Sequence, residues 1–161
     1  MTDKQALYHT LVQQAGSIIH GEKDLIANMA NLSALLFNQL ANVNWAGFYL
    51  YKEGELVLGP FQGQVACIRI AMGKGVCGTA ALSRTTQRVD DVHDFAGHIA
   101  CDAASNSEIV IPIVINDELI GVLDIDSPIF SRFDEDDQKG LEQLVACFVE
   151  HYHVMQLSSV S

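Results

Sequence analysis

Hydrophobic residues recur at helical spacing through the first forty positions of the chain. Leu7, Leu11 and Ala15 are each four residues apart, which predicts an amphipathic helix that ends near Gly21. Asp24 suits the N-cap position of a second helix. Its expected apolar side consists of Ile26, Met29, Ala30, Ser33, Leu36 and Phe37. Such stripes are typical of core or dimer contacts.

After residue 44 the pattern changes to the alternation of β-strands, interrupted by turns rich in glycine. The elements expected here are strands at 45–51, 56–59, 67–70 and 87–92, a hairpin turn at 52–55, a glycine-rich turn at 73–78 and a short helix at 79–83. Residues 94–107 show little periodicity, and a loop of this length is uncommon in a compact domain unless it is functional.

The last third of the chain predicts a hairpin and a closing helix. Apolar runs at 109–115 and 119–125 flank Asn116-Asp117, a favourable hairpin turn. Asp134 is expected to cap a helix whose apolar face holds Leu141, Leu144, Val145, Phe148, Val149 and Tyr152. The order of elements predicts an α+β fold in one domain, with a mostly antiparallel central sheet and the N- and C-terminal helices packed on one face.

Composition and charge exclude several functional classes. The 161 residues are 49% hydrophobic and 18% charged, as expected of a globular domain, and the net charge is −11. A binder of nucleic acid or of anionic lipid needs a basic surface instead. No apolar run suits a membrane span and the N-terminus does not resemble a signal peptide. We therefore expect a cytoplasmic location, where cysteines are seldom in permanent disulfides.

The glycine-rich turn carries the spacing G-x-G-x-x-G at Gly73, Gly75 and Gly78. A dinucleotide site is not expected, because the following helix is too short for a βαβ crossover. A phosphate loop is excluded, since Lys74 is not followed by Ser or Thr in the required frame. The remaining roles are a tight turn and backbone amides that face an anionic group of a small ligand.

Three of the four cysteines, Cys67, Cys77 and Cys101, are expected in or beside loops. Cys101 lies in the long loop among small residues that would let a substrate approach. A protonated His98 would favour the thiolate of Cys101 and Asp102 would disfavour it. The alternative that Cys101 is a loop cysteine without a role therefore stays open. Cys147 is expected on the apolar face of the last helix as an inert thiol.

A zinc site built from His93, His98 and the cysteines is the alternative use of these residues. Structural zinc sites bring their ligands in close pairs such as C-x-x-C, and here only His98 and Cys101 are so spaced. No metal is therefore expected to be bound.

Glu108, Asp124 and Asp126 form a second candidate cluster. Asp124 and Asp126 are two residues apart on one strand and so share a face, and Glu108 opens the neighbouring strand of the hairpin. Three carboxylates on one face repel each other, which raises at least one pKa. They would be satisfied by a shared proton, a substrate ammonium, or Mg²⁺ or Ca²⁺. The alternative is a solvated strand end.

Trp45 and Tyr49 are four residues apart on the first expected strand and so also share a face. They could form the wall of a pocket for a small apolar or thioether ligand, because sulfur packs well on aromatic rings. The alternative is that both belong to the core.

The combination of these motifs resembles the free methionine-(R)-sulfoxide reductase family, enzymes built on a GAF domain. The resemblance extends from about residue 5 into the last helix. It rests on W-A-G-F-Y from Trp45, G-V-C-G-T from Gly75, G-H-I-A-C-D from Gly97 and L-D-I-D-S from Leu123. It implies one GAF domain over residues 1–161, with a core at about 20–155.

The resemblance also implies a reaction, the reduction of free L-methionine (R)-sulfoxide through a cysteine sulfenic acid and an intramolecular disulfide. Cys101 falls on the family's catalytic cysteine, Cys67 on its main resolving cysteine and Cys77 on a further cysteine that can take part. Substrate-binding positions of the family match Glu108, Asp124, Asp126, Trp45 and Tyr49. No cofactor is implied, since electrons come from thioredoxin. A homodimer is expected.

Two other functions remain open at this point. A GAF-type sensor would bind a small ligand without turnover, although sensors usually carry an output domain and need no group of thiols. A zinc-stabilised fold would use the cysteines as ligands.

Overall fold

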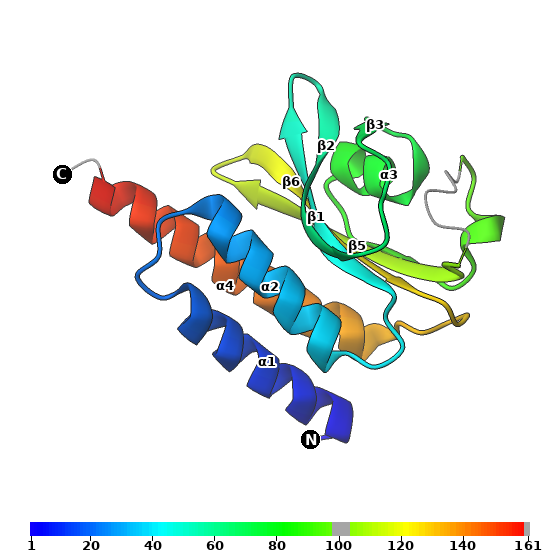
Figure 1. Ribbon diagram of the computed structural model, residues 1–161, viewed down its shortest axis with the longest axis horizontal. Coiled ribbons are helices and arrows are strands. Elements are labelled where there is room, and N and C mark those ends of the chain that lie inside the picture. The colour runs from blue at the N-terminus through cyan, green and yellow to red at the C-terminus, as the bar shows by residue number, and fades with distance from the viewer. Residues whose placement is uncertain (98–103, 160–161) are drawn as a thin grey trace.

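The computed structural model describes residues 1–97 and 104–159 and contains four α-helices, one short 3-10 helix and six strands in that part of the chain (Figure 1). The helices are α1 (Asp3–Ile19), α2 (Leu25–Gln39), α3 (Gly75–Ser83), α4 (Glu135–Ser159) and the 3-10 helix η1 (Val92–Asp94). The strands are β1 (Trp45–Lys52), β2 (Glu55–Gly63), β3 (Arg69–Ala71), β4 (Gln87–Val89), β5 (Ser107–Ile115) and β6 (Glu118–Ser127).

The six strands form one sheet in the order β3-β2-β1-β6-β5-β4, and every neighbouring pair is antiparallel. The central pair β1 and β6 joins an N-terminal and a C-terminal part of the chain. The predicted α+β class with an antiparallel sheet is confirmed. No helix in the described part of the chain combines the length and apolar character that crossing a membrane requires.

The helix starts follow the capping residues predicted from the sequence. Asp24 accepts a hydrogen bond from the backbone N–H of Ala27 at 2.8 Å, and Asp134 accepts one from the N–H of Asp137 at 3.1 Å. Each side chain satisfies an N–H group that has no partner inside its own helix. The predicted N-caps of α2 and α4 are therefore confirmed.

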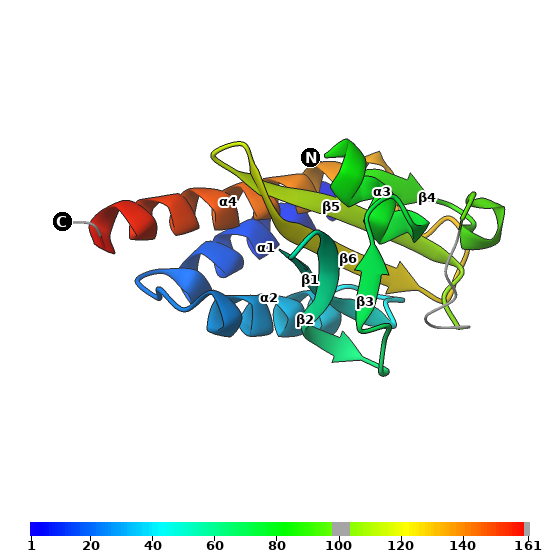
Figure 2. The same cartoon turned by 90° about the horizontal axis from the view of Figure 1, so that it is seen from above.

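The two faces of the sheet are covered differently (Figures 1 and 2). The N- and C-terminal helices lie on one side, as predicted: α2 and α4 pack on that face of the sheet and α1 packs on these two helices, whereas the short helix α3 lies on the other face. Because side chains alternate along a strand, odd-numbered residues of β5 and of β6 from Gly121 onward face the long helices, and even-numbered ones face α3. The large core includes Phe48, Ile109, Ile111, Leu123, Ile125, Leu36, Leu141 and Phe148.

The predicted apolar side of α2 is wrong at two positions. Ile26 is 52% exposed and Ala30 is also exposed, whereas Leu32 is fully buried. The buried face of α2 is centred on Met29, Leu32 and Leu36, so Ile26 and Ala30, four residues apart, lie together on its flank.

The glycine-rich segment differs most from its prediction. Helix α3 begins at Gly75 rather than at residue 79, so Cys77 lies on a helix and not in a loop. A Cβ atom on Gly78 would lie 2.5 Å from the carbonyl oxygen of Ala71. This glycine therefore permits close packing of the helix on the end of β3, which a turn-based interpretation misses.

Candidate functional site

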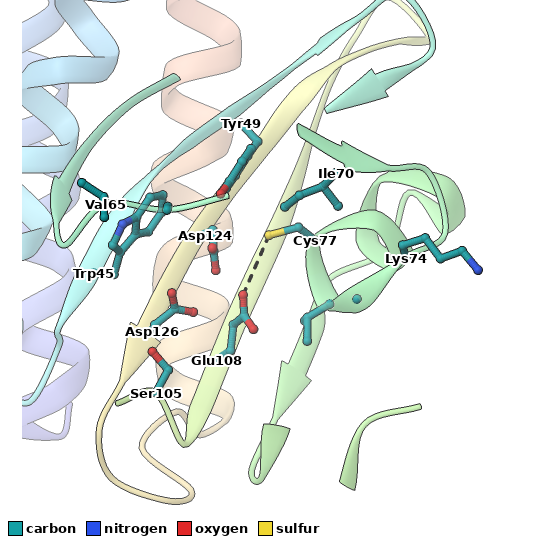
Figure 3. Close-up of a pocket in the computed structure, with 13 residues that line it drawn as sticks. Trp45, Tyr49, Val65, Ile70, Lys74, Cys77, Ser105, Glu108, Asp124 and Asp126 are labelled. Atoms are coloured by element: carbon teal, nitrogen blue, oxygen red, sulfur yellow. Dashed lines mark hydrogen bonds between the residues drawn. The ribbon is translucent and has the colours of Figure 1, made fainter. Parts of the chain in front are cut away.

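A cavity lies between α3 and the face of the sheet formed by β1, β5 and β6 (Figure 3). It combines aromatic, apolar and acidic walls with one thiol. The residues that line it are Trp45, Tyr49, Val65, Ala66, Ile70, Lys74, Gly75, Val76, Cys77, Ser105, Glu108, Asp124 and Asp126. Six of the eight residues expected at the site, Cys77 among them, are therefore brought together around one space.

Strand register places the three carboxylates side by side. Glu108 of β5 is directly opposite Asp126 of β6, and Asp124 is opposite Val110, two positions further along the same face. The predicted shared face is confirmed. Asp124 is only 5% exposed, so the alternative of a solvated strand end is wrong.

Burial and mutual repulsion keep protons on this cluster. The pKa of Glu108 is well above its usual range because the carboxyl is buried and because the charge of Asp124 is close. Burial and the charge of Asp126 likewise raise the pKa of Asp124. Since the two groups are in contact, the raised pKa values describe a pair that holds its last proton to a higher pH than an ordinary carboxyl group does.

One oxygen of Asp124 has no partner. Its Oδ1 is buried and accepts no hydrogen bond from any of the described residues. A buried acceptor without a partner costs about 1–3 kcal/mol. The site therefore contains a polar group that is prepared for a ligand rather than for the folded chain itself.

Cys77 reaches the carboxylates from the first turn of α3. Its Sγ donates to Oε2 of Glu108 at 3.8 Å (Figure 3). Burial, followed by the nearby charges of Asp124 and Glu108, raises the pKa of this thiol well above its ordinary value. Cys77 is thus a neutral hydrogen-bond donor in this cavity, which is the opposite of an activated thiolate.

Two aromatic rings, those of Trp45 and Tyr49, form the opposite wall. Trp45 stacks on Tyr49 with ring centroids 6.0 Å apart and on Phe61 at 5.1 Å. Their polar ends hold the segment that follows β2, because Trp45 Nε1 donates to the carbonyl of Gln64 at 3.1 Å and the Tyr49 hydroxyl donates to that of Cys67 at 2.8 Å. Burial raises the pKa of Tyr49, so its hydroxyl stays protonated.

The four cysteines have different surroundings. Cys67 is disulfide-bonded, whereas Cys77 and Cys147 are free thiols. Cys101, the expected nucleophile, lies outside the described residues. Cys147 is partly exposed on α4, where its sulfur is close to Gly16 of α1, and it is remote from the residues that line the cavity.

The sequence did not predict Ser105, which lines the cavity, or Phe61, which stacks on the cavity residue Trp45. The return strand was expected at residues 56–59, so it stopped short of Pro60, a residue that cannot donate to a ladder. The β1–β2 register instead shifts between Gly47 and Tyr49, and this bulge accommodates the proline so that β2 continues to Phe61. Ser105 is buried at the cavity edge and accepts a hydrogen bond from Asn44 Nδ2 at 3.3 Å.

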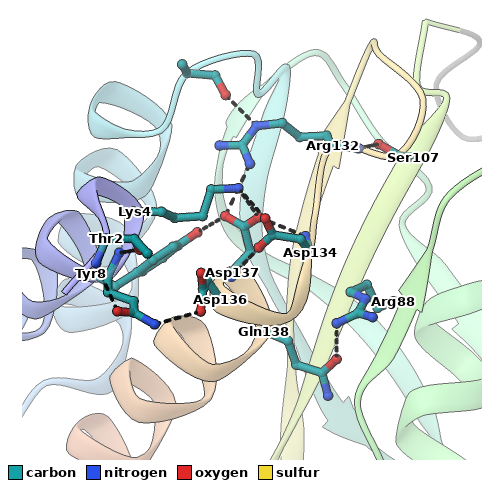
Figure 4. Close-up of polar contacts among 12 residues, drawn as sticks. Thr2, Lys4, Tyr8, Arg88, Ser107, Arg132, Asp134, Asp136, Asp137 and Gln138 are labelled. Atoms are coloured by element: carbon teal, nitrogen blue, oxygen red, sulfur yellow. Dashed lines mark hydrogen bonds and ion pairs between the residues drawn. The ribbon is translucent and has the colours of Figure 1, made fainter.

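A second buried acidic group, at the start of α4, is not a candidate site because its charge is paired (Figure 4). Asp137 is fully buried. Its two oxygens accept hydrogen bonds from the Tyr8 hydroxyl at 2.6 Å, from Lys4 Nζ at 2.9 Å and from Arg132 at 3.2 Å. The N–H of Asp134 adds a fourth bond. This arrangement joins α1 to α4.

The metal-ligand set suggested by the sequence differs from the one in the structure. The ring of His93 contacts Asn106 Oδ1 at 3.1 Å, and His98 and Cys101 lie outside the described residues. Within residues 1–97 and 104–159, the group of side chains able to hold an ion is Cys77, Glu108 and Asp124, whose ligand atoms all lie within 4.8 Å of one another.

Comparison with known proteins adds independent information. A family model described as a GAF domain matches residues 27–146. The free methionine-R-sulfoxide reductase of Escherichia coli (strain K12) is 55% identical over 144 residues, which span 89% of this chain and 87% of that protein.

Two solved structures are similar over nearly the whole chain. Free methionine-R-sulfoxide reductase from Neisseria meningitidis, in complex with its substrate, has a TM-score of 0.92 and 41% identity, and the match covers 98% of this chain and 95% of that one. A candidate GAF sensor protein from Burkholderia vietnamiensis has a TM-score of 0.91 and 60% identity, with 93% and 96% covered.

Proposed function

This chain belongs to the GAF-domain family of free methionine-R-sulfoxide reductases, and from that premise we propose that it reduces free methionine-R-sulfoxide to methionine. The observation that carries the proposal is the cavity in which buried carboxyl groups with raised pKa values face an aromatic wall. An oxidoreductase with this substrate needs both a proton source and a surface that accepts a methylsulfinyl group.

The carboxyl pair supplies the proton. A sulfoxide sulfur becomes electrophilic only when its oxygen is protonated or strongly hydrogen-bonded. Glu108 and Asp124 retain a proton near neutral pH because burial and repulsion raise their pKa values. A group with a normal carboxyl pKa would already be ionised and could not donate.

The same cluster accounts for a preference for the free amino acid. The substrate's ammonium group would offset the negative charge that remains on the cluster and give the unpartnered oxygen of Asp124 a donor. A methionine sulfoxide inside a peptide has no such ammonium. Trp45 and Tyr49 provide stacked rings on which the methyl and sulfur can pack.

The redox step is assigned to Cys101 on the family resemblance. Its sulfur attacks the sulfoxide sulfur, the S–O bond of the substrate breaks, and oxygen ends on Cys101 as a sulfenic acid while methionine leaves. The substrate sulfur gains two electrons and the cysteine sulfur loses two. The proton that the thiol gives up ends on the sulfenic acid. The proton that the carboxyl pair lends to the sulfoxide oxygen returns to the pair.

Cys67 is the proposed resolving thiol. It condenses with the sulfenic acid to form a disulfide and water, and a dithiol reductant such as thioredoxin restores both thiols. The disulfide-bonded state of Cys67, beside free Cys77 and Cys147, supports this role. The thioredoxin partner, the homodimer and the cytoplasmic location remain predictions.

The test is turnover on defined substrates. Purified reduced protein with dithiothreitol is given free methionine-R-sulfoxide, the S epimer, or an N-acetylated R sulfoxide, and released methionine is measured. We expect turnover only with the free R form. Cys101→Ser should abolish it, whereas Cys147→Ser, remote from the cavity, should have full activity.

Thiol counting separates the enzyme from a sensor. Without added reductant, a stoichiometric amount of free methionine-R-sulfoxide should remove two thiols per chain. In Cys67→Ser the loss should fall to one thiol, because the sulfenic acid still forms on Cys101 but no disulfide with residue 67 can follow. Binding of the sulfoxide with no loss of thiols and no methionine would overturn the proposal in favour of a ligand-binding sensor.

A further inference from the structure

We propose that Cys77, Glu108 and Asp124 form a binding site for a thiophilic divalent metal ion, Zn²⁺ in the first place, which occupies the substrate cavity and inhibits the protein. The proposal concerns an inhibitory ion and not a cofactor. The metal site is defined by the geometry of its ligands alone, whereas the inhibition rests on the proposed reductase function.

The three ligands come from three different elements and converge on one point. Cys77 is on α3, Glu108 on β5 and Asp124 on β6, and their ligand atoms lie within 4.8 Å of one another. Zn–S bonds of about 2.3 Å and Zn–O bonds of about 2.1 Å at tetrahedral angles place S and O about 3.6 Å apart. The Cys77 Sγ to Glu108 Oε2 distance is already 3.8 Å, so this pair needs almost no movement.

An independent observation also points to a ligand at this position. Asp124 is 95% buried, and its Oδ1, on a side chain that lines the cavity, has no hydrogen-bond partner in the described part of the chain. Nor does any ion pair there involve Glu108 or Asp124. Lys74 lines the cavity but its side chain extends away from the carboxylates (Figure 3). A metal ion would satisfy both the unpartnered oxygen and the uncompensated charge.

The donor set selects the kind of ion. Mg²⁺ and Ca²⁺ take six or more oxygen ligands, and a thiol in the first position does not suit them. Zn²⁺ accepts one sulfur and two carboxylate oxygens, with a water in the fourth position. That fourth position opens into the cavity where the sulfoxide would lie, so the ion and the substrate compete. The ion would also occupy the oxygens that have to carry the proton.

The experiment uses Co²⁺ as a spectroscopic probe, because cobalt bound to a thiolate gives a charge-transfer band in the near ultraviolet. The protein is a Cys67→Ser/Cys101→Ser double variant, which removes two other thiols that could bind the ion, and the reductant is a phosphine that contains no thiol. We expect one Co²⁺ per chain with the thiolate band, and displacement of the cobalt by one equivalent of Zn²⁺.

Matched variants locate the site. Adding Cys77→Ser should eliminate the thiolate band, adding Cys147→Ser should leave it intact, and adding Glu108→Gln should weaken Co²⁺ binding at least tenfold. Circular dichroism identifies any variant that fails to fold, and in that case Glu108→Gln alone decides. A band that persists without Cys77, or an absence of cobalt binding in the folded double variant, overturns the proposal.

Inhibition is tested separately on the wild-type chain. Zn²⁺ should raise the apparent KM for the sulfoxide while leaving kcat unchanged at saturating substrate, and a chelator should reverse the effect. Inhibition that substrate cannot overcome would contradict competition at this cavity. Cobalt binding at Cys77 in a protein without reductase activity would remove the proposed function and leave the metal site standing, so the two failures are distinguishable.

Discussion

The molecule contains two buried aspartates that differ in how completely they are paired. Asp137 at the start of α4 receives hydrogen bonds on both oxygens, from Lys4, Tyr8, Arg132 and the N–H of Asp134 (Figure 4). Asp124 on β6 is surrounded by other acids and a thiol, and one of its oxygens has no partner among the described residues (Figure 3).

The difference shows which buried charge serves the fold and which serves a ligand. A buried carboxylate that is fully hydrogen-bonded stabilises the folded state once it is in place, since removing it leaves its cationic partners uncompensated. A cluster of like charges does the opposite, and it persists only where another constraint keeps it. Stability and activity should therefore respond to the two aspartates in opposite ways.

The largest effect is expected on activity from Asp124→Asn. Loss of the acid should lower kcat/KM for free methionine-R-sulfoxide by about 10²–10⁴-fold, the usual contribution of general acid catalysis. The melting temperature should not fall, because the substitution removes repulsion. Asp117→Asn, an exposed position at the tip of the same hairpin, is the control and should keep full activity. An active Asp124→Asn protein would contradict the assignment.

The reverse result is expected for Asp137→Asn. Leaving Lys4 and Arg132 without their buried partner should cost about 3 kcal/mol. For a domain of this size that corresponds to a decrease of roughly 6–12 °C in Tm, measured by thermal unfolding. The folded protein should retain its kcat/KM. The neighbouring Asp136→Asn, which loses a single exposed hydrogen bond to Gln5, should change Tm far less.

The pH dependence of stability should also differ between the two regions. Raised pKa values of Glu108 and Asp124 mean that their contribution is fully present below the ordinary values of 4.5 and 3.8 and is lost as pH rises through the folded values. Asp134 behaves oppositely. Partial burial opposes its ionisation, but hydrogen bonds from Lys4 and from backbone N–H lower its pKa to about 2, so its contribution is lost as pH falls from 3.8 toward that value.

Tm measured from pH 3 to pH 8 checks this expectation. The double variant Glu108→Gln/Asp124→Asn should lose less stability than the wild type as pH rises toward 8. Activity of the wild type should fall over the same rise, as the pair gives up its last proton. Identical slopes for the two proteins would show that the pair has no raised pKa.

The smallest effect is expected for Tyr49→Phe. The aromatic ring remains, but the hydrogen bond to the carbonyl of Cys67 is lost, worth about 1 kcal/mol. Disulfide formation should slow about fivefold in a single turnover, followed by thiol loss, while the rate of methionine release and KM are nearly unchanged. Tyr51→Phe, on the same strand but 40% exposed, is the matched control.

The sequence predicts local structure where one residue type decides it. Asp24 and Asp134 as caps, the Asn116-Asp117 turn and the shared face of Asp124 and Asp126 all follow from short-range rules, and the structure confirms each. The fold class follows from the order of these elements.

What the sequence does not predict depends on contacts between distant segments. Gly78 suggests a turn, but its role is the close approach to Ala71, which only the packed structure shows. Phe61 was missed because a bulge opposite Phe48 lets the strand pass through a proline. The hydrogen bond from Cys77 to Glu108 also depends on such distant contacts. Helix α3 must begin at Gly75 and lie on the sheet to bring the thiol to the carboxyl group.

The turn between β5 and β6 also determines which side chains of these strands face the cavity. Asn116 and Asp117 both have positive φ, at 53° and 64°, and this tight turn fixes the pairing that ends with Glu108 opposite Asp126. A strand shifted by a single residue presents its other side. One inserted residue at the turn, far from any substrate, would therefore direct Ile109 into the cavity and Glu108 into the apolar core. The number of residues between the turn and Glu108 therefore matters for the chemistry of the cavity as much as the carboxyl group itself does.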